Sequence, residues 1–490
     1  MKRVLVPLLA AAMLVAAMAP AAVLASGQVD SFRVVNSPFT SDAVSTRHKA
    51  GVRLTLAGAA HVTLTIETTG GVVVRHLANG VTLAAGSHAW KWAGRNDGGT
   101  FVPDGDYVAH LVVTDGFDTL DQALLVRKGM PPIYPFNPGA ITVLINPGHG
   151  GYTSGAVAKG VTEKFLNLDI GLRLRRLLEA AGVNVVMTRS TDVHVPDPEF
   201  DVNGDGVAGP TKPGGDDWDG LAYRIDIGNE ARADVHIFNH NNGSSVRGRR
   251  GTQTYSGMDR SFTPENLIFA TDVQAESIVQ LDSFRSATYY PIDGGVKNGR
   301  NYYTLRPYSL AVPDPPLEPR PALQPTIMTE SLYVSDPIER AILLKGAGRE
   351  AIAIAMYLGI RDYLATRDYG IRYQLIGGPT DVAAGASADY RVQVTNTGNQ
   401  ASAGWQLQLH SVPAVPFYDG SGAIGDPLGS VNIPDGLAPG QSTTLSVHAT
   451  APPTAGAWLV KGDVFIGGSD RPYLSQRGVV AIQVPLTTEP

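Results

Sequence analysis

The sequence of 490 residues contains no cysteine. This absence excludes disulfide bonds, thiolate catalysis, cysteine-ligated metals and lipid attachment through an N-terminal cysteine. Any metal ion must therefore take its ligands from histidine, aspartate or glutamate. The sequence also lacks a long block of lysine and arginine, and its formal net charge is a modest −6. The sequence therefore lacks the concentrated positive charge of a nucleic-acid-binding protein, and we expect no nucleic-acid partner.

Long apolar runs are absent except at the amino terminus. The basic start Met1–Arg3 precedes an apolar stretch from Val4 to about Ala19, and the small-residue end Val23–Ala25 follows. This order is typical of a secretory signal peptide, which we place at residues 1–25. No other stretch approaches the ~20 apolar residues of a membrane-crossing helix. We therefore expect an exported protein of the periplasm, cell wall or medium, with no stable membrane anchor after signal cleavage.

The remaining chain is long enough for about three domains at ~150 residues each, and its 43% hydrophobic content can fill their cores. Residues 30–127 alternate between apolar and polar, as in Val62–Ile66, which predicts a β-sandwich. A proline-punctuated linker follows at 128–139. Residues 371–486 return to alternating strands with turn signals at regular intervals, which predicts a second sandwich.

Between the sandwiches, residues 140–366 have the pattern of an α/β domain. The apolar run Ile141–Ile145 predicts a buried strand, an apolar helical face spans Thr162–Ala181, and Val183–Met187 predicts the next strand. Strand, helix and strand in close succession form a βαβ unit, which favours a mostly parallel sheet with helices on both faces. Further helices are expected at 221–232, 265–281 and 337–364.

Four polar residues of this domain can converge at one edge of its sheet. His149 directly follows the first predicted strand, and Glu163 begins the next helix on its apolar face. His240 and Glu330 each end a further predicted strand. The carboxyl ends of strands are where α/β sheets usually bind ligands. Because a buried, unpaired charge is costly, Glu163 needs a partner or a metal.

Two histidines and one glutamate are typical of a catalytic zinc site, because they leave one coordination position open. A further glutamate can then serve as general base or acid. The residue types therefore favour metal-assisted hydrolysis.

Six separated segments of the central region also carry a family resemblance. They are Asn146–Gly151, Glu163–Leu168, Thr188–Arg189, Arg224–Asn229, Asp234–Asn242 and Pro325–Glu330. Their order resembles that of zinc-dependent N-acetylmuramoyl-L-alanine amidases, over roughly residues 141–365. The resemblance implies Zn²⁺ held by His149, Glu163 and His240, with Glu330 as the catalytic carboxylate. It also implies peptidoglycan as the partner, cleaved between the lactyl group of N-acetylmuramic acid and the L-alanine of the stem peptide.

The flanking regions resemble accessory modules. The segments Val74–Leu77, Ala85–Arg95 and Pro103–Tyr107 resemble the immunoglobulin-like module of flagellar hook-capping proteins. The second sandwich resembles immunoglobulin-like repeats of bacterial surface and adhesion proteins. The expected fold class is therefore multi-domain, with a central α/β amidase domain between two all-β immunoglobulin-like sandwiches. Trp90 and Trp92 are candidates for stacking on sugars, although at least one is expected in the core.

Some residues depart from the family pattern. Asn146 stands where the family usually has Asp, and Asn239 precedes the second histidine where Ser is common, so we expect different hydrogen bonds around the ligands. Arg224 and Asn229 match family positions. On a helix they are expected to make structural contacts, so we leave them outside the predicted site.

Two insertions distinguish the chain. Asp201, Asn203 and Asp205 match the start of an EF-hand calcium loop, but the twelfth position is Lys212 rather than Glu. A Ca²⁺ site and a solvated acidic loop both stay open there. The second insertion, Arg306–Pro325, contains seven prolines and predicts an extended, stiff loop near the site.

The sequence thus favours an exported peptidoglycan amidase that acts in wall remodelling or autolysis. Two alternatives stay open: a wall-binding or adhesion protein with an inactive amidase-like core, and a zinc amidase that acts on another peptide. The presence of all four polar residues argues against the first alternative.

Overall fold

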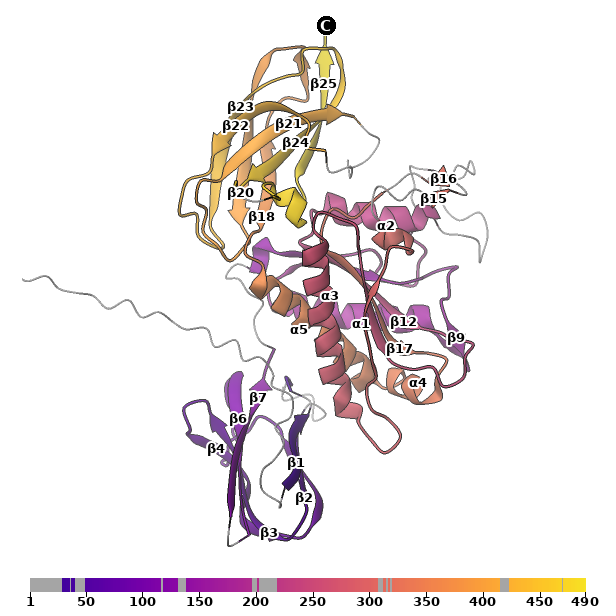
Figure 1. Ribbon diagram of the computed structural model, residues 1–490, viewed down its shortest axis with the longest axis vertical. Helices are drawn as coiled ribbons and strands as arrows, with labels where there is room; N and C mark the ends of the chain where they lie inside the picture. The colour runs from indigo at the N-terminus through magenta and orange to yellow at the C-terminus, as the bar shows by residue number, and fades with distance from the viewer. Residues whose placement is uncertain are drawn as a thin grey trace, which may run out of the picture. The chain divides into compact units, whose positions relative to one another are not determined.

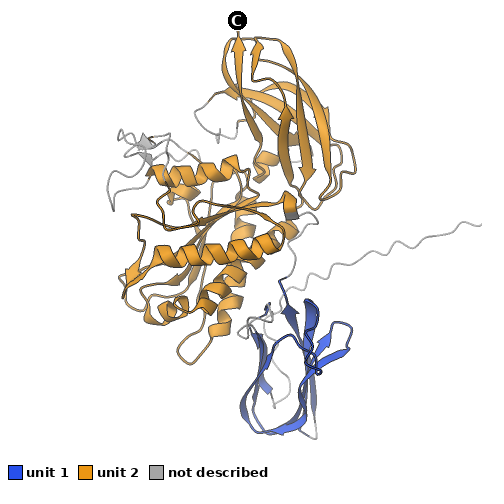
Figure 2. Ribbon diagram, turned by 180° about the vertical axis from the view of Figure 1, so that it is seen from behind, with its two compact units in different colours: residues 1–131 blue, residues 132–490 orange. Residues whose placement is uncertain are grey.

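The structure is a computed structural model. It describes residues 29–35, 37–39, 49–115, 118–130, 138–195, 201, 218–306, 320–414, 423–468 and 470–490, and the backbone at 312–313 and 316–317. The chain divides into two compact units, Met1–Pro131 and Pro132–Pro490 (Figure 2). The predicted signal peptide at 1–25 lies outside the described residues. Among the helices that are described, none has the length and apolar character to cross a membrane.

The first unit contains a β-sandwich with antiparallel pairing throughout its described strands. One sheet consists of β1 (Val29–Val35), β2 (Ala50–Leu56) and β5 (Gly86–Trp92). The other consists of β3 (Ala60–Thr68), β4 (Val73–Leu83), β6 (Gly105–Thr114) and β7 (Thr119–Lys128). Alternate residues of β3 are fully buried between the sheets, as the period of two requires. Trp92 lies in this core and packs edge-on against Tyr107, whereas Trp90 is half-buried.

The second unit begins with a six-stranded sheet in the order β11-β8-β12-β17-β13-β14. Figure 1 labels two of its central strands, β12 and β17. Its strands are β8 (Thr142–Pro147), β11 (Asn184–Met187), β12 (Val235–Asn242), β13 (Thr252–Ser256), β14 (Asp293–Asn298) and β17 (Thr326–Tyr333). Four of the five strand pairings are parallel, and β13 runs antiparallel to β17. The predicted βαβ unit and the mostly parallel sheet are therefore confirmed.

Helices cover both faces of this sheet. They are α1 (Glu163–Ala180), α2 (Trp218–Glu230), α3 (Thr263–Leu281), α4 (Pro337–Leu343) and α5 (Gly346–Thr366). Gly171 of α1 approaches Asn239 of β12, while the neighbouring Phe238 packs against Ala222 and Ile225 of α2. Successive residues of a strand point to opposite faces, so α1 and α2 lie on opposite sides.

Short elements complete the unit. They are η1 (Pro138–Ala140), β9 (Val157–Ala158), β10 (Val161–Thr162), η2 (Asp282–Phe284), η3 (Tyr303–Leu305), β15 (Val312–Pro313), β16 (Pro316–Leu317) and η4 (Leu474–Arg477). The single helix expected at 337–364 is instead two helices, α4 and α5. Asp336 caps α4 by accepting hydrogen bonds from the backbone N–H groups of Ile338 and Glu339.

Two strands also run further than the sequence indicated. His240 lies two residues before the end of β12, and Glu330 lies three residues before the end of β17. The prediction that each residue ends its strand was therefore wrong. The polar residues Asn241 and Asn242 resemble a loop in sequence, but β12 continues through them, and Asn242 is in register with Tyr333 of β17.

The second sandwich follows α5. One sheet consists of β18 (Ile371–Gly377), β20 (Ser387–Asn396) and β23 (Ser442–Thr450). The other consists of β19 (Asp381–Ala383), β21 (Gln406–Pro413), β22 (Asp426–Asn432), β24 (Gly456–Phe465) and β25 (Ile482–Glu489). Tyr373, Val392, Trp405 and Leu407 are among the residues of its core.

This sandwich and the α/β domain belong to the same compact unit, and side chains join them. Arg367, just beyond α5, forms an ion pair of 2.8 Å with Asp234, and the two side chains are 6% and 9% exposed. Arg372 of β18 donates to the Thr142 hydroxyl at the start of β8. Arg471 pairs with Glu265 of α3 at 2.7 Å. The sandwich therefore contacts the amino ends of the sheet strands.

A fragment that stops at Thr366 is consequently expected to be less stable than one that continues to Pro490. It lacks Arg367 and leaves Asp234 without its ion-pair partner, and loss of one member of a buried ion pair typically costs ~3–5 kcal/mol. Urea unfolding of the fragments 132–366 and 132–490 measures the difference for the α/β domain. Equal free energies of unfolding would show that the α/β domain does not depend on these contacts.

Candidate metal centre

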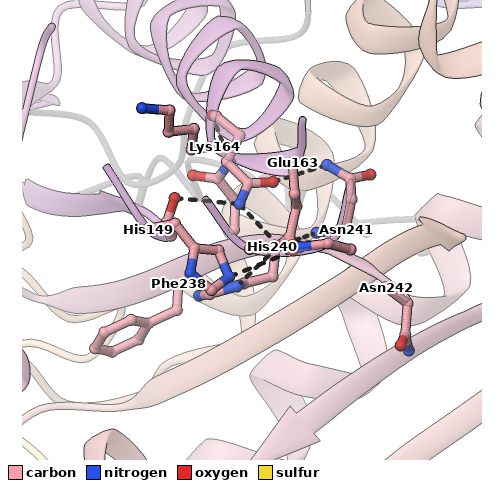
Figure 3. A network of polar contacts seen from close by, with 12 residues as sticks. His149, Glu163, Lys164, Phe238, His240, Asn241 and Asn242 are labelled. Atoms are coloured by element: carbon pink, nitrogen blue, oxygen red, sulfur yellow. Dashed lines mark hydrogen bonds and ion pairs between the residues drawn. The ribbon is translucent and has the colours of Figure 1, made fainter. Parts of the chain in front are cut away.

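Three side chains from three elements converge at the carboxyl edge of the sheet (Figure 3). His149 follows β8, Glu163 begins α1 and His240 lies in β12. The Nε2 atom of His149 lies 3.3 Å from Oε2 of Glu163. The Nδ1 atom of His240 lies 3.2 Å from Oε1 of the same carboxylate. The structure thus brings together the three residues that the sequence assigned to a metal.

These two separations, each to a different oxygen of Glu163, are close to the ligand-to-ligand distance around a small tetrahedral ion. Zinc binds imidazole nitrogen and carboxylate oxygen at ~2.0–2.2 Å, so two ligand atoms of a tetrahedral site lie about 3.3 Å apart. The ligand atoms of all three residues lie within 4.8 Å of one another. Two imidazoles and one carboxylate are also a donor set that zinc prefers. The residues present therefore fit a zinc ion.

The loop after β8 has an unusual backbone that places His149. The φ angle of His149 is 61°, in the left-handed region that costs an L-residue about 1–2 kcal/mol. Gly148 lies directly against the second ligand, because a Cβ there would be 2.2 Å from the imidazole of His240. Gly148 of the predicted motif is therefore needed for close packing at the site.

Glu163 is held firmly in place. Its side chain is 5% exposed. Oε1 accepts hydrogen bonds from the Asn167 side chain at 3.0 Å and from the backbone N–H of Asn241 at 3.1 Å. Oε2 accepts from the backbone N–H of Ala156 at 2.8 Å. Burial alone would raise the pKa of Glu163, but hydrogen bonds from both histidines offset it and hold the pKa far below its usual value. The side chain is therefore a fixed anion.

His240 is suited to act as a neutral ligand. Burial lowers its pKa, the Glu163 carboxylate opposes this effect, and the positive charge of Arg224 adds to it. The net result is a pKa below the usual value of histidine. The ring is therefore neutral at pH 7, with a nitrogen lone pair available for a metal.

Glu330 lies beside the cluster. In the parallel register of β12 and β17 it pairs with His240, so the two side chains project from the same face of the sheet. Burial raises the pKa of Glu330 well above its usual value, and the nearby Glu163 carboxylate raises it further. Its Oε2 atom is buried and accepts no hydrogen bond from any residue that the structure describes. This carboxyl group is poised to hold or release a proton.

Sequence reasoning missed several residues around the ligands. Asn167 and Asn241 both hydrogen-bond Glu163, and the Asn241 side chain also donates to Asn167 at 2.8 Å. The position of Asn167, four residues after Glu163 on one helix, was a usable signal. The role of Asn241 rests on its backbone N–H, for which the residue type carries no signal. Asn239 donates to the Asn167 carbonyl at 2.7 Å, which anchors α1 to β12.

Some of the remaining predicted site residues lie outside the part of the chain that the structure describes. Asp201 is described, but Asn203 and Asp205 lie outside the described residues, so the Ca²⁺ site stays a prediction. Residues 307–311, 314–315 and 318–319 of the proline-rich insertion lie outside them as well. Asn229 makes structural contacts, as expected, because its side chain bonds the backbone of Pro321 and Leu323.

The fold and this cluster define a class of protein: an α/β domain with a candidate metal centre of two histidines and one glutamate at the carboxyl edge of a mostly parallel sheet. Comparison with known families makes this more specific. Residues 143–362 match the profile of the N-acetylmuramoyl-L-alanine amidase family, and residues 41–116 match that of the FlgD Ig-like domain. The chain therefore carries an amidase-family domain and a FlgD-type immunoglobulin-like domain.

Curated relatives agree with the amidase match. The chain is 24% identical over 257 residues to N-acetylmuramoyl-L-alanine amidase AmiC of Neisseria meningitidis serogroup B, covering 46% of this chain and 53% of that protein. It is 23% identical over 222 residues to N-acetylmuramoyl-L-alanine amidase LytC of Bacillus subtilis, covering 45% and 35%. The chain thus spans about half or less of the length of these two relatives.

Solved structures include a similar domain. The N-acetylmuramoyl-L-alanine amidase from Clostridium difficile 630 is 21% identical, with a TM-score of 0.34, and the match covers 46% of this chain and 98% of that one.

Proposed function

We propose that this protein is an exported, zinc-dependent N-acetylmuramoyl-L-alanine amidase that acts in cell-wall remodelling or autolysis. Its substrate is peptidoglycan, cleaved between N-acetylmuramic acid and the L-alanine of the stem peptide. The observation that carries the proposal is the cluster of His149, Glu163 and His240 within the region that matches the amidase family. The signal-peptide pattern at 1–25 supports export.

The cluster residues would hold the zinc ion. When bound, zinc supplies a Lewis acid that polarises the scissile carbonyl and activates water. His149 and His240 provide nitrogen donors, and Glu163 provides the single negative charge, fixed by Asn167 and two backbone N–H groups. Because three protein ligands leave a tetrahedral position open, the set suits catalysis better than a purely structural site.

Glu330 would carry the proton. Hydrolysis adds water to the amide carbon and breaks the carbon–nitrogen bond, so one proton of the water must reach the departing nitrogen of L-alanine. The Oε2 atom of Glu330 is buried, lacks a hydrogen-bond partner among described residues, and lies on the face that also carries His240. It can accept the proton from water and then donate it to the nitrogen.

The direct test uses the purified full-length protein without its signal peptide. Elemental analysis measures zinc per chain, and mass spectrometry identifies the products from sacculi and from soluble muropeptides. We expect one zinc and free stem peptides that begin with L-alanine. Binding to sacculi without release of peptide would instead support a wall-binding protein with an inactive core. Cleavage of other peptide amides, but not of muropeptides, would support the alternative substrate.

A further inference from the structure

Two buried arginines hold the loop that presents His149. Arg224 of α2 donates from Nη1 to the Pro147 carbonyl at 3.2 Å and from Nη2 to the His149 carbonyl at 3.0 Å. Arg189, which follows β11, donates from Nε to the Pro147 carbonyl at 2.9 Å and from Nη2 to the Gly148 carbonyl at 2.9 Å. Three consecutive carbonyl groups of the loop are therefore fixed by guanidinium groups.

The same arginines connect the loop to the other parts of the site. Nη2 of Arg189 also donates to the Lys164 carbonyl at 2.8 Å, one residue beyond Glu163. Nη1 of Arg224 donates to the side-chain oxygen of Asn146 at 2.6 Å, at the end of β8. The loop of His149 and the first turn of α1 are thus joined through Arg189 as well as through the ligands themselves.

Because both arginine side chains are buried, they cannot replace these hydrogen bonds with hydrogen bonds to water. Arg189 and Arg224 are both 3% exposed. Burial lowers the pKa of Arg189 to about 10, so the guanidinium stays charged at neutral pH. A buried cation must be satisfied by hydrogen bonds, and much of what Arg189 donates goes to this loop and to α1. Because the guanidinium is planar, it fixes the direction of each carbonyl as well as its distance.

We propose that Arg189 and Arg224, here called the arginine clamp, are positioning residues of the metal centre. They set the orientation of His149 relative to Glu163 and thereby the affinity for zinc. The inference rests on the proposed function, because it concerns the same site. It changes the assignment of Arg224 made from sequence: its contacts are structural, but the structure they support is the ligand loop.

A purely structural role makes a different prediction from a positioning role. If the clamp serves only to attach α2 and the loop after β11, its removal lowers stability and leaves the zinc affinity of the folded protein unchanged. If it positions His149, affinity falls even where the protein stays folded. Residues that orient metal ligands through hydrogen bonds typically change metal affinity by 10- to 100-fold.

The test measures zinc affinity of the full-length protein by competition with a chromophoric chelator, beside the melting temperature without metal. In Arg224→Lys the ammonium cannot reproduce the planar pair of donors, so we expect zinc to bind ~10- to 100-fold more weakly. Arg189→Lys tests the second arginine and keeps the proposal testable if the first variant does not fold. The absorption spectrum of the cobalt-substituted protein should also change, because it reports ligand geometry.

Arg367→Lys is the matched control. Arg367 is a buried arginine near the amino end of β12, paired with Asp234, whereas the metal cluster is at the carboxyl end. Its variant is expected to melt at a lower temperature and to bind zinc normally. If both clamp variants bind zinc with wild-type affinity and give the wild-type cobalt spectrum, the positioning role of the arginine clamp is wrong. The proposed function would be unaffected by that result. A wild-type protein that binds no zinc would overturn the proposed function, and the clamp with it.

Discussion

Glu330→Gln is expected to keep its zinc and to lose turnover of muropeptides by ~10²- to 10⁴-fold, the usual contribution of a general acid or base. The amide preserves the size and shape of the side chain but cannot accept a proton at Oε2. Glu330 is adjacent to the cluster but is not part of it, so metal content should stay at one ion per chain. Elemental analysis beside the hydrolysis rate gives both quantities, and added zinc should not restore activity.

Glu350→Gln provides a matched control for this result. Glu350 of α5 is a largely buried carboxylate that pairs with Arg173 and Arg176 of α1. Its amide variant should be less stable, yet a folded sample should turn over at the wild-type rate. Near-normal turnover in Glu330→Gln would remove the assigned role of Glu330 and place the proton transfer elsewhere.

Glu163→Ala is expected to lose the metal. The substitution removes the only carboxylate of the cluster, whose two oxygens lie 3.2 and 3.3 Å from the ligand atoms of the histidines. Zinc should fall well below one ion per chain after dialysis, and activity should return in part when zinc is added in excess. This response separates the two glutamates, since excess zinc should rescue Glu163→Ala and not Glu330→Gln.

Glu179→Ala is the control on the same helix. Glu179 is exposed and pairs with Arg175 one turn away, so its loss should change neither zinc content nor rate. Full zinc retention in Glu163→Ala would contradict its role as a ligand. It would also leave His149 and His240 without the carboxylate that completes the donor set.

The local spacing of apolar residues predicted several helices and strands of the fold correctly. The apolar helical face predicted over Thr162–Ala181 corresponds to α1 (Glu163–Ala180), and the run Ile141–Ile145 falls on β8 (Thr142–Pro147). These elements form because one face of each must be buried, and that requirement is visible in the spacing of apolar residues. The break between α4 and α5 was missed, because apolar residues continue through Leu344, although Gly346 and Gly348 follow directly as a break signal.

Contacts between the second sandwich and the α/β domain could not be predicted. Arg471 lies 206 residues from its partner Glu265, and nothing in either local sequence indicates the pairing. The clamp is a different case, because its acceptors are backbone carbonyls, which every residue type has. The sequence therefore indicated which residues could bind a metal. The hydrogen bonds that position these residues could be identified only in the structure.

Gly148 gives a way to judge related sequences. Any side chain at this position would begin 2.2 Å from Cε1 and Nε2 of His240 and would displace the ring. A relative that keeps both histidines and the glutamate, but replaces this glycine, would have the same ligand residues with the second histidine displaced from the site. The glycine at this position is thus as informative about whether a homologue retains the proposed metal centre as the three candidate ligand side chains are.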